Sequence, residues 1–273
     1  MNNPKSNLRV ALGGLGAIGY RVAKVLDEGI PGLELVAVSA NDRNRAAERV
    51  SKFKKRPDVL PLEDLAENSD VVVESAPAAV FDQVAVPAIE AGRIFMPMSS
   101  GALIARPQLI ERAKETGARI VIPTGALMGF DAVRAAAEGT IRSVRMKSVK
   151  PIEGMITAPY LVERGIDVRT FTERQKVFEG TAREAAAGFP ANTNIAAALS
   201  LAGAGPDQTF LEIWADPATD RNVHTVELEG DETRFSLTIE GVPSPENPAS
   251  GILVPLSLIA TLRSLTSPLR VGT

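Results

Sequence analysis

The sequence predicts an α/β fold, in which a doubly wound parallel sheet of the Rossmann type is joined to an α+β second domain with an antiparallel or mixed sheet. Short β-branched runs alternate with amphipathic segments over residues 7–145, which predicts a parallel sheet wrapped by helices. That alternation ends near residue 140, and three strand-like segments follow further on. We therefore expect a first domain over 1–139, with 251–273 packing back on it, and a second domain over 140–250.

Five apolar runs in the first domain are expected as strands buried on both faces, as parallel strands usually are. They lie at 8–13, 33–39, 70–75, 93–98 and 118–123. The amphipathic stretches between them predict helices at 17–28, 43–53, 78–91 and 106–116, the last followed by the helix-ending Gly117.

The second domain begins with a strand-like run at 141–150 and a polar, irregular stretch to about 175. Thr181 and Glu184 have the spacing of a capping box and predict a short helix ending at Gly188. A second helix is expected at 194–203 and a last one at 251–264. Segments with alternating polarity predict an antiparallel sheet with one solvated face, and they lie at 210–216, 223–229 and 233–241.

Composition limits the possible functions. Apolar residues make up 45% of the chain and charged residues 23%, which is typical of globular proteins, and the net charge of −3 argues against nucleic acid as a partner. No run approaches the roughly 18 apolar residues of a membrane span and no signal-peptide core precedes the first strand, so we expect a cytoplasmic protein without membrane contacts. With no cysteine and one histidine, we expect no metal site, and redox chemistry requires an organic cofactor.

The loop after the first strand, GLGAIG, has the spacing that holds a dinucleotide pyrophosphate. Gly14 allows a tight turn, Gly16 allows close approach of backbone to phosphate, and Gly19 allows close packing of helix on strand. Ala17 and Ile18 begin the following helix, whose amino end attracts phosphate. Because a strand and a helix flank the loop, we favour a cofactor site for NAD or NADP over a purely structural turn.

The end of the second strand bears on the choice between the two cofactors. An acidic residue about 20 positions after the loop usually binds the ribose hydroxyls of NAD, but Ser39 stands 20 residues after Gly19. The nearest acid is displaced to Asp42, with Asn41 and Arg43 beside it. Ser39, Asn41 and Arg43 are therefore candidate contacts to a 2′-phosphate. The alternative is that Asn41 and Asp42 only cap the next helix and that Arg43 is solvated.

Three later strands end in small residues, at 75–77, 99–102 and 124–126. Carboxyl ends of parallel strands share the sheet edge at which ligands bind, and small side chains leave space for a flat ring. Ala76 and Gly101 are therefore candidate cofactor contacts. Ordinary strand-to-helix turns explain any one of these ends, but explain all three together less well.

His224, the single histidine, lies at the start of a predicted strand, close to Asn222 and Asp216 in the sequence. An imidazole with an ordinary pKa near 6.5 suits proton transfer at neutral pH, although most histidines have structural or surface roles. Lys150 ends the first strand of the second domain and offers a cation to an anionic substrate, although most lysines simply face water.

Several separate blocks make the chain similar to the L-aspartate dehydrogenase family over nearly its whole length. They are GLGAIG at 14–19, SSGAL at 99–103, PTGALMGFDA at 123–132, VFEGTAREAAAGFPANTNIAAALSLAGAG at 177–205, ADPATDRNVH at 215–224 and VPSPENPASG at 242–251. The block at 177–205, with the Asp-Pro, Asn and His that follow, is the most specific.

This resemblance implies a homodimeric enzyme that oxidises L-aspartate with NAD or NADP to iminosuccinate, which water converts to oxaloacetate and ammonia. The reverse reaction is reductive amination. The resemblance also implies an active-site histidine at His224 and cofactor contacts at Ala126 and Asn194. Two substrate carboxylates require cationic or amide partners, for which Lys150, Asn222 and Thr124 are our candidates.

The chain departs from the family pattern at Met128 and Phe130, where smaller residues are usual, and in the segment 148–155. We expect both on the substrate side. Two alternatives therefore stay open: a related amino-acid or imine oxidoreductase with another substrate, and an NAD(P)-binding regulatory protein without turnover.

Overall fold

The computed structural model describes residues 6–190 and 193–272, and the chain divides into two compact units. Residues 191–192, which belong to the block at 177–205, lie outside the described residues. The first unit consists of Met1–Ser99, Arg106–Pro123 and Pro255–Arg270, and the second of Ser100–Ala105, Thr124–Val254 and Val271–Thr273. The second unit thus begins before the boundary expected after residue 139, because the helix at Phe130–Ala137 packs against a helix of that unit.

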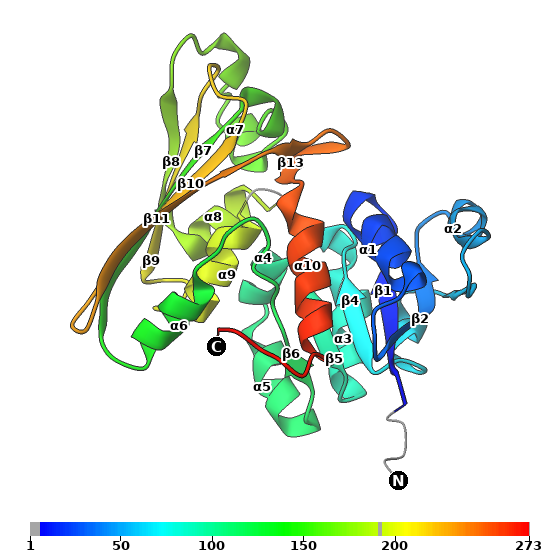
Figure 1. The fold of residues 1–273 in the computed structure, drawn as a ribbon. Helices are drawn as coiled ribbons and strands as arrows, with labels where there is room; N and C mark the ends of the chain where they lie inside the picture. Colours follow the sequence, from blue (N-terminus) through cyan, green and yellow to red (C-terminus); the bar gives the residue numbers. More distant parts are fainter. Residues whose placement is uncertain (1–5, 191–192, 273) are drawn as a thin grey trace. The chain divides into compact units, whose positions relative to one another are not determined.

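The sheet of the first unit has six parallel strands in the order β3-β2-β1-β4-β5-β6 (Figure 1). Their bounds are β1 Leu8–Gly13, β2 Leu33–Ser39, β3 Asp58–Val59, β4 Val71–Glu74, β5 Ile94–Pro97 and β6 Arg119–Ile120. Strand order reverses between β1 and β4, and the crevice at such a reversal is where doubly wound folds bind ligands. The predicted parallel sheet is confirmed, with β3 as a short strand that the sequence did not predict.

Helices cover both faces of this sheet. They are α1 Ala17–Glu28, α2 Arg43–Val50, η1 Glu63–Ala66, η2 Ala78–Val80, α3 Phe81–Glu90, α5 Pro107–Thr116 and α10 Leu253–Ser264. The hydrophobic core on one face combines β1, β2 and β4 with α1, α2 and α10, and Leu258 and Leu262 of α10 are fully buried there. Helix α3 contacts β4, β5 and α5 from the other face, where Phe81 packs edge to face on Phe95.

The second unit contains a mixed sheet in the order β11-β10-β7-β9-β8. The bounds are β7 Ile141–Lys150, β8 Gln175–Thr181, β9 Thr209–Ala215, β10 Asn222–Gly230 and β11 Arg234–Gly241. The expectation of a sheet built from three consecutive segments was incomplete, because β7 lies between β9 and β10 and pairs with β9 in parallel. The buried residues of β7, which are Val144, Met146, Ser148, Val149 and Lys150, are consistent with its central position.

Helices α8 and α9 contact β9 and so cover one face of this sheet, while the other face carries charged side chains. The remaining elements are α4 Ser100–Ile104, α6 Phe130–Ala137, η3 Ile152–Gly154, α7 Pro159–Glu163, η4 Val168–Thr170, α8 Ala182–Gly188, α9 Asn194–Ala202, and a hairpin of β12 Pro243–Ser244 and β13 Asn247–Gly251. The predicted capping box of α8 is present. Among the described residues, no helix is long and apolar enough to cross a membrane.

Candidate active site

The glycine loop of the first unit has a shape that side chains would block. Gly14 has φ +110°, and a Cβ there would lie 2.6 Å from the carbonyl oxygen of Ser75. A Cβ on Gly19 would lie 1.9 Å from the carbonyl oxygen of Gly14, whereas one on Gly16 would meet no atom within 4 Å. Packing therefore requires glycine at positions 14 and 19. Gly16 faces open space, and this matches the position that must admit a phosphate group.

Helix α1 begins directly behind this open position, with Gly16 as its N-cap and no side-chain cap. Ala17 and Ile18 therefore contribute backbone N–H groups that have no partner within the helix, at the positive end of its dipole. The cradle and the helix end together fit a dinucleotide pyrophosphate.

The end of β2 lies against this loop, because the Gly14 amide donates to the carbonyl of the buried Ser39 at 2.9 Å. Asn41 and Arg43 are exposed. Asp42 caps α2 by accepting from the amide of Arg45 at 3.0 Å. Its carboxylate is therefore engaged with the helix, and the exposed side chains at this end are an amide and a guanidinium.

Sequence reasoning missed Glu74, the last residue of β4. Its carboxylate is fully buried, and it accepts hydrogen bonds from the amides of Ala76 and Ser99, at 3.1 and 3.0 Å, and from the Ser99 hydroxyl at 3.0 Å. Burial raises the pKa of Glu74 to about 7, although these hydrogen bonds act in the opposite direction. A single acid at the end of the apolar run VVVE was the available signal.

Three other candidate cofactor contacts meet at the amino end of α9 in the second unit. The Gly101 amide donates to Asn194 Oδ1 at 3.1 Å. A Cβ on Gly125 would lie 3.4 Å from Ile195, so the turn that contains Thr124 and Ala126 also lies beside this helix end. The structure therefore brings together Gly101, the 124–126 turn and Asn194, which are far apart in sequence.

His224 lies on β10 directly opposite Ser148 of β7, and its Nδ1 is 3.0 Å from Ser148 Oγ. Both side chains are buried on the face of the sheet that α8 and α9 cover. Burial, followed by the positive charge of Lys150, lowers the pKa of His224 to about 3. The imidazole is therefore neutral at physiological pH. Ser148 was not predicted, although it stands two residues before Lys150 and so shares its face of the strand.

Lys150 and Asn222 lie beside this histidine. Val149 pairs with Val223, so continuing the antiparallel register by one residue places Asn222 opposite Lys150. Both side chains are buried, with 4% of each exposed. Desolvation lowers the pKa of Lys150 to about 8, so its ammonium group is mostly charged at neutral pH. Three of the candidate residues, Lys150, Asn222 and His224, thus form one group, whereas Thr124 lies on the separate 124–126 turn.

An ion pair holds the turn between β9 and β10. The Asp216 amide donates to the Lys150 carbonyl at 3.0 Å, and Asp216 Oδ1 accepts from the Ala218 amide at 2.9 Å. Arg174 Nε lies 2.7 Å from Asp216 Oδ2, which is buried. This link fixes the chain just before Asn222. Arg174 was also missed, because 42 residues separate it from Asp216.

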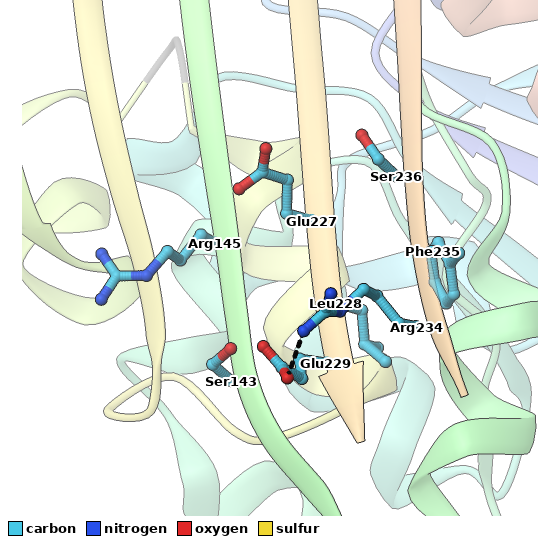
Figure 2. Close-up of a pocket in the computed structure, with 8 residues that line it drawn as sticks. All are labelled: Ser143, Arg145, Glu227, Leu228, Glu229, Arg234, Phe235 and Ser236. Atoms are coloured by element: carbon cyan, nitrogen blue, oxygen red, sulfur yellow. Dashed lines mark hydrogen bonds and ion pairs between the residues drawn. The ribbon is translucent and has the colours of Figure 1, made fainter. Parts of the chain in front are cut away.

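A depression on the opposite face of the same sheet does not contain these groups. Figure 2 shows its lining residues, which include Arg145, Glu227 and the ion pair between Arg234 and Glu229. Glu227 pairs with Arg145 in register. Along their strands, these residues are an odd number of positions from His224 and Ser148, so their side chains project from the opposite, charged face. The charges that line this depression are balanced and largely solvated, so we do not place the active site there.

Comparisons with known proteins cover nearly the whole chain. Residues 131–265 match the family "Aspartate dehydrogenase, C-terminal", and residues 14–123 match "Homoserine dehydrogenase, NAD binding domain". The chain is 49% identical to an L-aspartate dehydrogenase of Bradyrhizobium diazoefficiens over 98% of its own length and 95% of the relative's. It is 46% identical to L-aspartate dehydrogenase 3 of Bordetella bronchiseptica, over 98% of this chain and 99% of that one.

Solved structures show the same fold at lower identity. The crystal structure of aspartate dehydrogenase from Thermotoga maritima has a TM-score of 0.74 and 23% identity, and the match covers 97% of this chain and 100% of that chain. Scyllo-inositol dehydrogenase from Lactobacillus casei has a TM-score of 0.54 and 14% identity, over 95% of this chain and 88% of that chain.

Proposed function

Because the chain belongs to the L-aspartate dehydrogenase family, we propose that it catalyses the NAD(P)-dependent oxidation of L-aspartate to iminosuccinate, and that His224 is its proton acceptor. Water then converts iminosuccinate to oxaloacetate and ammonia, and the reverse reaction is reductive amination. The observation that carries the assignment of His224 is the buried group formed by His224, Ser148 and Lys150, because it combines a neutral base with a cation for an anionic substrate.

The glycine cradle of the first unit is the proposed site for the pyrophosphate of NAD or NADP. Gly16 leaves the necessary space, and the amino end of α1 supplies N–H groups and a positive dipole end. Asn41 and Arg43 are the proposed contacts to the adenosine ribose or its 2′-phosphate. When bound, the nicotinamide accepts a hydride from C2 of aspartate. Gly101, Ala126 and Asn194 are further proposed contacts to the cofactor.

Proton removal from the substrate is assigned to His224. Hydride can leave C2 only when the nitrogen lone pair is available, so the substrate ammonium must first lose a proton. If Nδ1 carries the imidazole proton and donates to Ser148 Oγ, the lone pair of Nε2 is available as the base. A substrate carboxylate beside Lys150 offsets the charge that lowers the pKa of His224, so substrate binding makes the imidazole a stronger base.

Lys150, Asn222 and Thr124 are the proposed partners of the two substrate carboxylates. Lys150 supplies the positive charge in a buried environment, where a charge-assisted hydrogen bond is stronger than on the surface. Asn222 supplies an amide from the adjacent strand. Orientation of C2 by these contacts is expected to provide much of the rate.

Steady-state assays test this proposal. We expect NAD(P)H formation with L-aspartate, and NAD(P)H consumption with oxaloacetate plus ammonia. His224→Asn is expected to lower kcat by roughly 100- to 10,000-fold, the usual contribution of a positioned general base. Turnover of a different amino acid in place of aspartate would indicate a related oxidoreductase. Dinucleotide binding without any turnover would indicate a regulatory protein.

We also propose a homodimer that works in the cytoplasm, as the family resemblance implies. Light scattering at several protein concentrations tests the dimer, and cell fractionation tests the location. A monomeric mass at every concentration would contradict the first, and recovery outside the cytoplasmic fraction would contradict the second.

A further inference from the structure

The Glu74 carboxylate connects two loops at the carboxyl edge of the parallel sheet. Glu74 pairs in register with Gly13 of β1 and with Pro97 of β5, so it ends the strand at the centre of the ligand-binding edge. Its Oε1 accepts from the amide of Ala76 in the loop after β4, and its Oε2 accepts from the amide of Ser99 in the loop after β5. One side chain therefore fixes both loops.

The same segment forms a wall of the glycine cradle. Ser75 Oγ donates to the Gly14 carbonyl at 3.1 Å, and the Ser75 amide donates to the Gly13 carbonyl at 2.8 Å. The Ser75 carbonyl oxygen lies only 2.6 Å from the position that a Cβ on Gly14 would take, which is too close for a side chain. Because residues 74–76 are continuous, a shift of Ala76 away from Glu74 moves the wall that shapes the cradle.

A buried carboxylate is unfavourable if its only role is to stabilise the fold. Removal of a charged group from water is costly, and apolar residues of similar volume often provide equal stability. Three hydrogen-bond donors offset that cost here. An acceptor that binds two amides and a hydroxyl at the cofactor edge is better explained by loop geometry than by packing.

We propose that Glu74 is a positioning residue for the dinucleotide, which holds the loops after β4 and β5 in the conformation that binds the cofactor. This inference rests on the proposed function, because it assumes that the glycine cradle binds NAD or NADP. It adds to that function a residue that acts on cofactor affinity through Ala76 and Ser99 rather than on the proton transfer at His224.

The ionised carboxylate is the form that satisfies all three donors. A proton on Oε2 would oppose the Ser99 amide, and a proton on Oε1 would leave the Ala76 amide with a poorer acceptor. A glutamine at this position places its NH₂ group against one of the same two amides. Glu74→Gln therefore keeps the size of the side chain but loses one of its backbone contacts.

Most charged groups on the neighbouring elements form ion pairs with other partners. The elements that contact β4 carry Arg9 on β1, Glu63 and Asp64 on η1, and Asp82 and Glu90 on α3, while β5 carries none. Arg9 pairs with Asp70, Asp82 with Arg106 and Glu90 with Arg112. Burial and the hydrogen bonds from Ser99, Ala76 and Met98 therefore dominate the pKa of Glu74, which is raised to about 7.

Fluorescence titration with NADH, on the full-length protein, tests the inference. We expect Glu74→Gln to weaken NADH binding tenfold or more and to raise the KM for the dinucleotide, with kcat at saturating cofactor nearly unchanged. The matched control is Asp70→Asn, which removes the acid immediately before the same strand and breaks its pair with Arg9. This control is expected to lower stability without changing NADH affinity.

The pH dependence of NADH binding gives a second readout. In the wild type, affinity is expected to fall as pH decreases through the Glu74 pKa of about 7, because protonation removes an acceptor. This dependence should be absent in Glu74→Gln. If Glu74→Gln does not fold, Ser99→Ala removes the hydroxyl donor, and Ser69→Ala, which removes a buried hydroxyl before β4, is its control.

The outcomes separate this inference from the proposed function. Wild-type protein that binds neither NADH nor NADPH would contradict the proposed function. If the wild type binds NADH and Glu74→Gln binds it with unchanged affinity, only the proposed role of Glu74 is contradicted. The same holds if Asp70→Asn loses as much NADH affinity as Glu74→Gln. A wild-type pH dependence that persists in Glu74→Gln would also overturn it.

Discussion

Ser148 Oγ and His224 Nδ1 lie 3.0 Å apart on adjacent antiparallel strands, at positions that face each other directly in register. Because the contact joins β7 to β10, a buried hydroxyl fixes the orientation of the imidazole and engages one of its two nitrogens.

Ser148→Ala should lower kcat about tenfold, less than the loss expected for His224→Asn, because the imidazole remains but its ring orientation and tautomer are no longer fixed. Affinity for NADH should stay the same. Ser143→Ala is the control, since this serine lies on the same strand but among the residues of the opposite face. Equal kcat values for the two variants would rule out a role of Ser148 in orienting the histidine.

Lys150→Gln should raise the KM for aspartate strongly, because the variant keeps a hydrogen-bonding side chain but loses the charge that pairs with a carboxylate. In the wild type, apparent aspartate affinity should fall as pH rises through the Lys150 pKa of about 8, since the ammonium group then loses its proton. Initial-rate measurements at several pH values check both effects.

The matched control for Lys150 is Lys147→Gln on the same strand. Lys147 projects from the opposite face, where its ammonium group lies 4.6 Å from the centre of the Trp214 ring. Its replacement should leave the KM for aspartate unchanged. If both variants raise that KM to the same extent, a general loss of positive charge explains the effect and Lys150 has no specific role.

Gly16→Ala and Gly19→Ala should separate cofactor binding from folding. The added methyl group at Gly16 meets no protein atom within 4 Å, so this variant should fold normally and bind dinucleotide weakly. At Gly19 the methyl group would lie 1.9 Å from the Gly14 carbonyl, so we expect a loss of stability of several kcal/mol. Thermal unfolding and NADH titration distinguish the two, and normal NADH affinity in Gly16→Ala would contradict the assignment of the cradle.

The buried histidine should also affect stability at low pH. His224 has a pKa of about 3 when folded, below its ordinary value of 6.5, so the unfolded chain takes up a proton that the folded chain does not. Its contribution is thus complete above about pH 6.5 and is lost as pH falls towards 3. By pH 5 the loss amounts to at most about 2 kcal/mol.

Urea unfolding of the wild type and of His224→Asn at pH 7 and pH 5 measures this contribution. The wild type should lose more stability than the variant between these pH values. Glu74 acts in the opposite direction, because its raised pKa favours folding as pH falls below about 7, but it is present in both proteins and cancels in the comparison. Parallel pH profiles would mean that His224 is protonated in the folded state.

The parts of the fold and of the site that the sequence predicted well depend on local patterns of residues. The spacing of Gly14, Gly16 and Gly19 reflects the geometry of one turn and the start of one helix, and the capping box at Thr181 spans a single helical turn. Alternation of apolar runs with amphipathic segments identified the parallel sheet, because its central strands β1, β4 and β5 are largely buried on both faces. Such signals can be recognised without knowing which strands are neighbours.

The features that were missed depend on pairing between distant segments. Glu74 becomes an anchor only because Ser99 follows the adjacent strand, and Ser148 becomes a partner of His224 only through the register of β7 with β10. The position of β7 between β9 and β10 likewise depends on pairing with two strands that are distant in sequence, and no local motif indicates it. The proposed role of His224 rested chiefly on the family resemblance, since one buried histidine has no spacing signature.

The position of helix α10 in the sequence determines when the core of the first unit can be completed during translation. Leu258, Ile259 and Leu262 complete the core formed by β1, β2, β4 and α1, although residues 124–252 of the second unit lie between α5 and α10 in the sequence. On a ribosome that adds about 5–20 residues per second, the glycine loop emerges many seconds before the helix that closes the core behind it. The first unit therefore reaches its final packing only after residues 124–252 of the second unit have been translated.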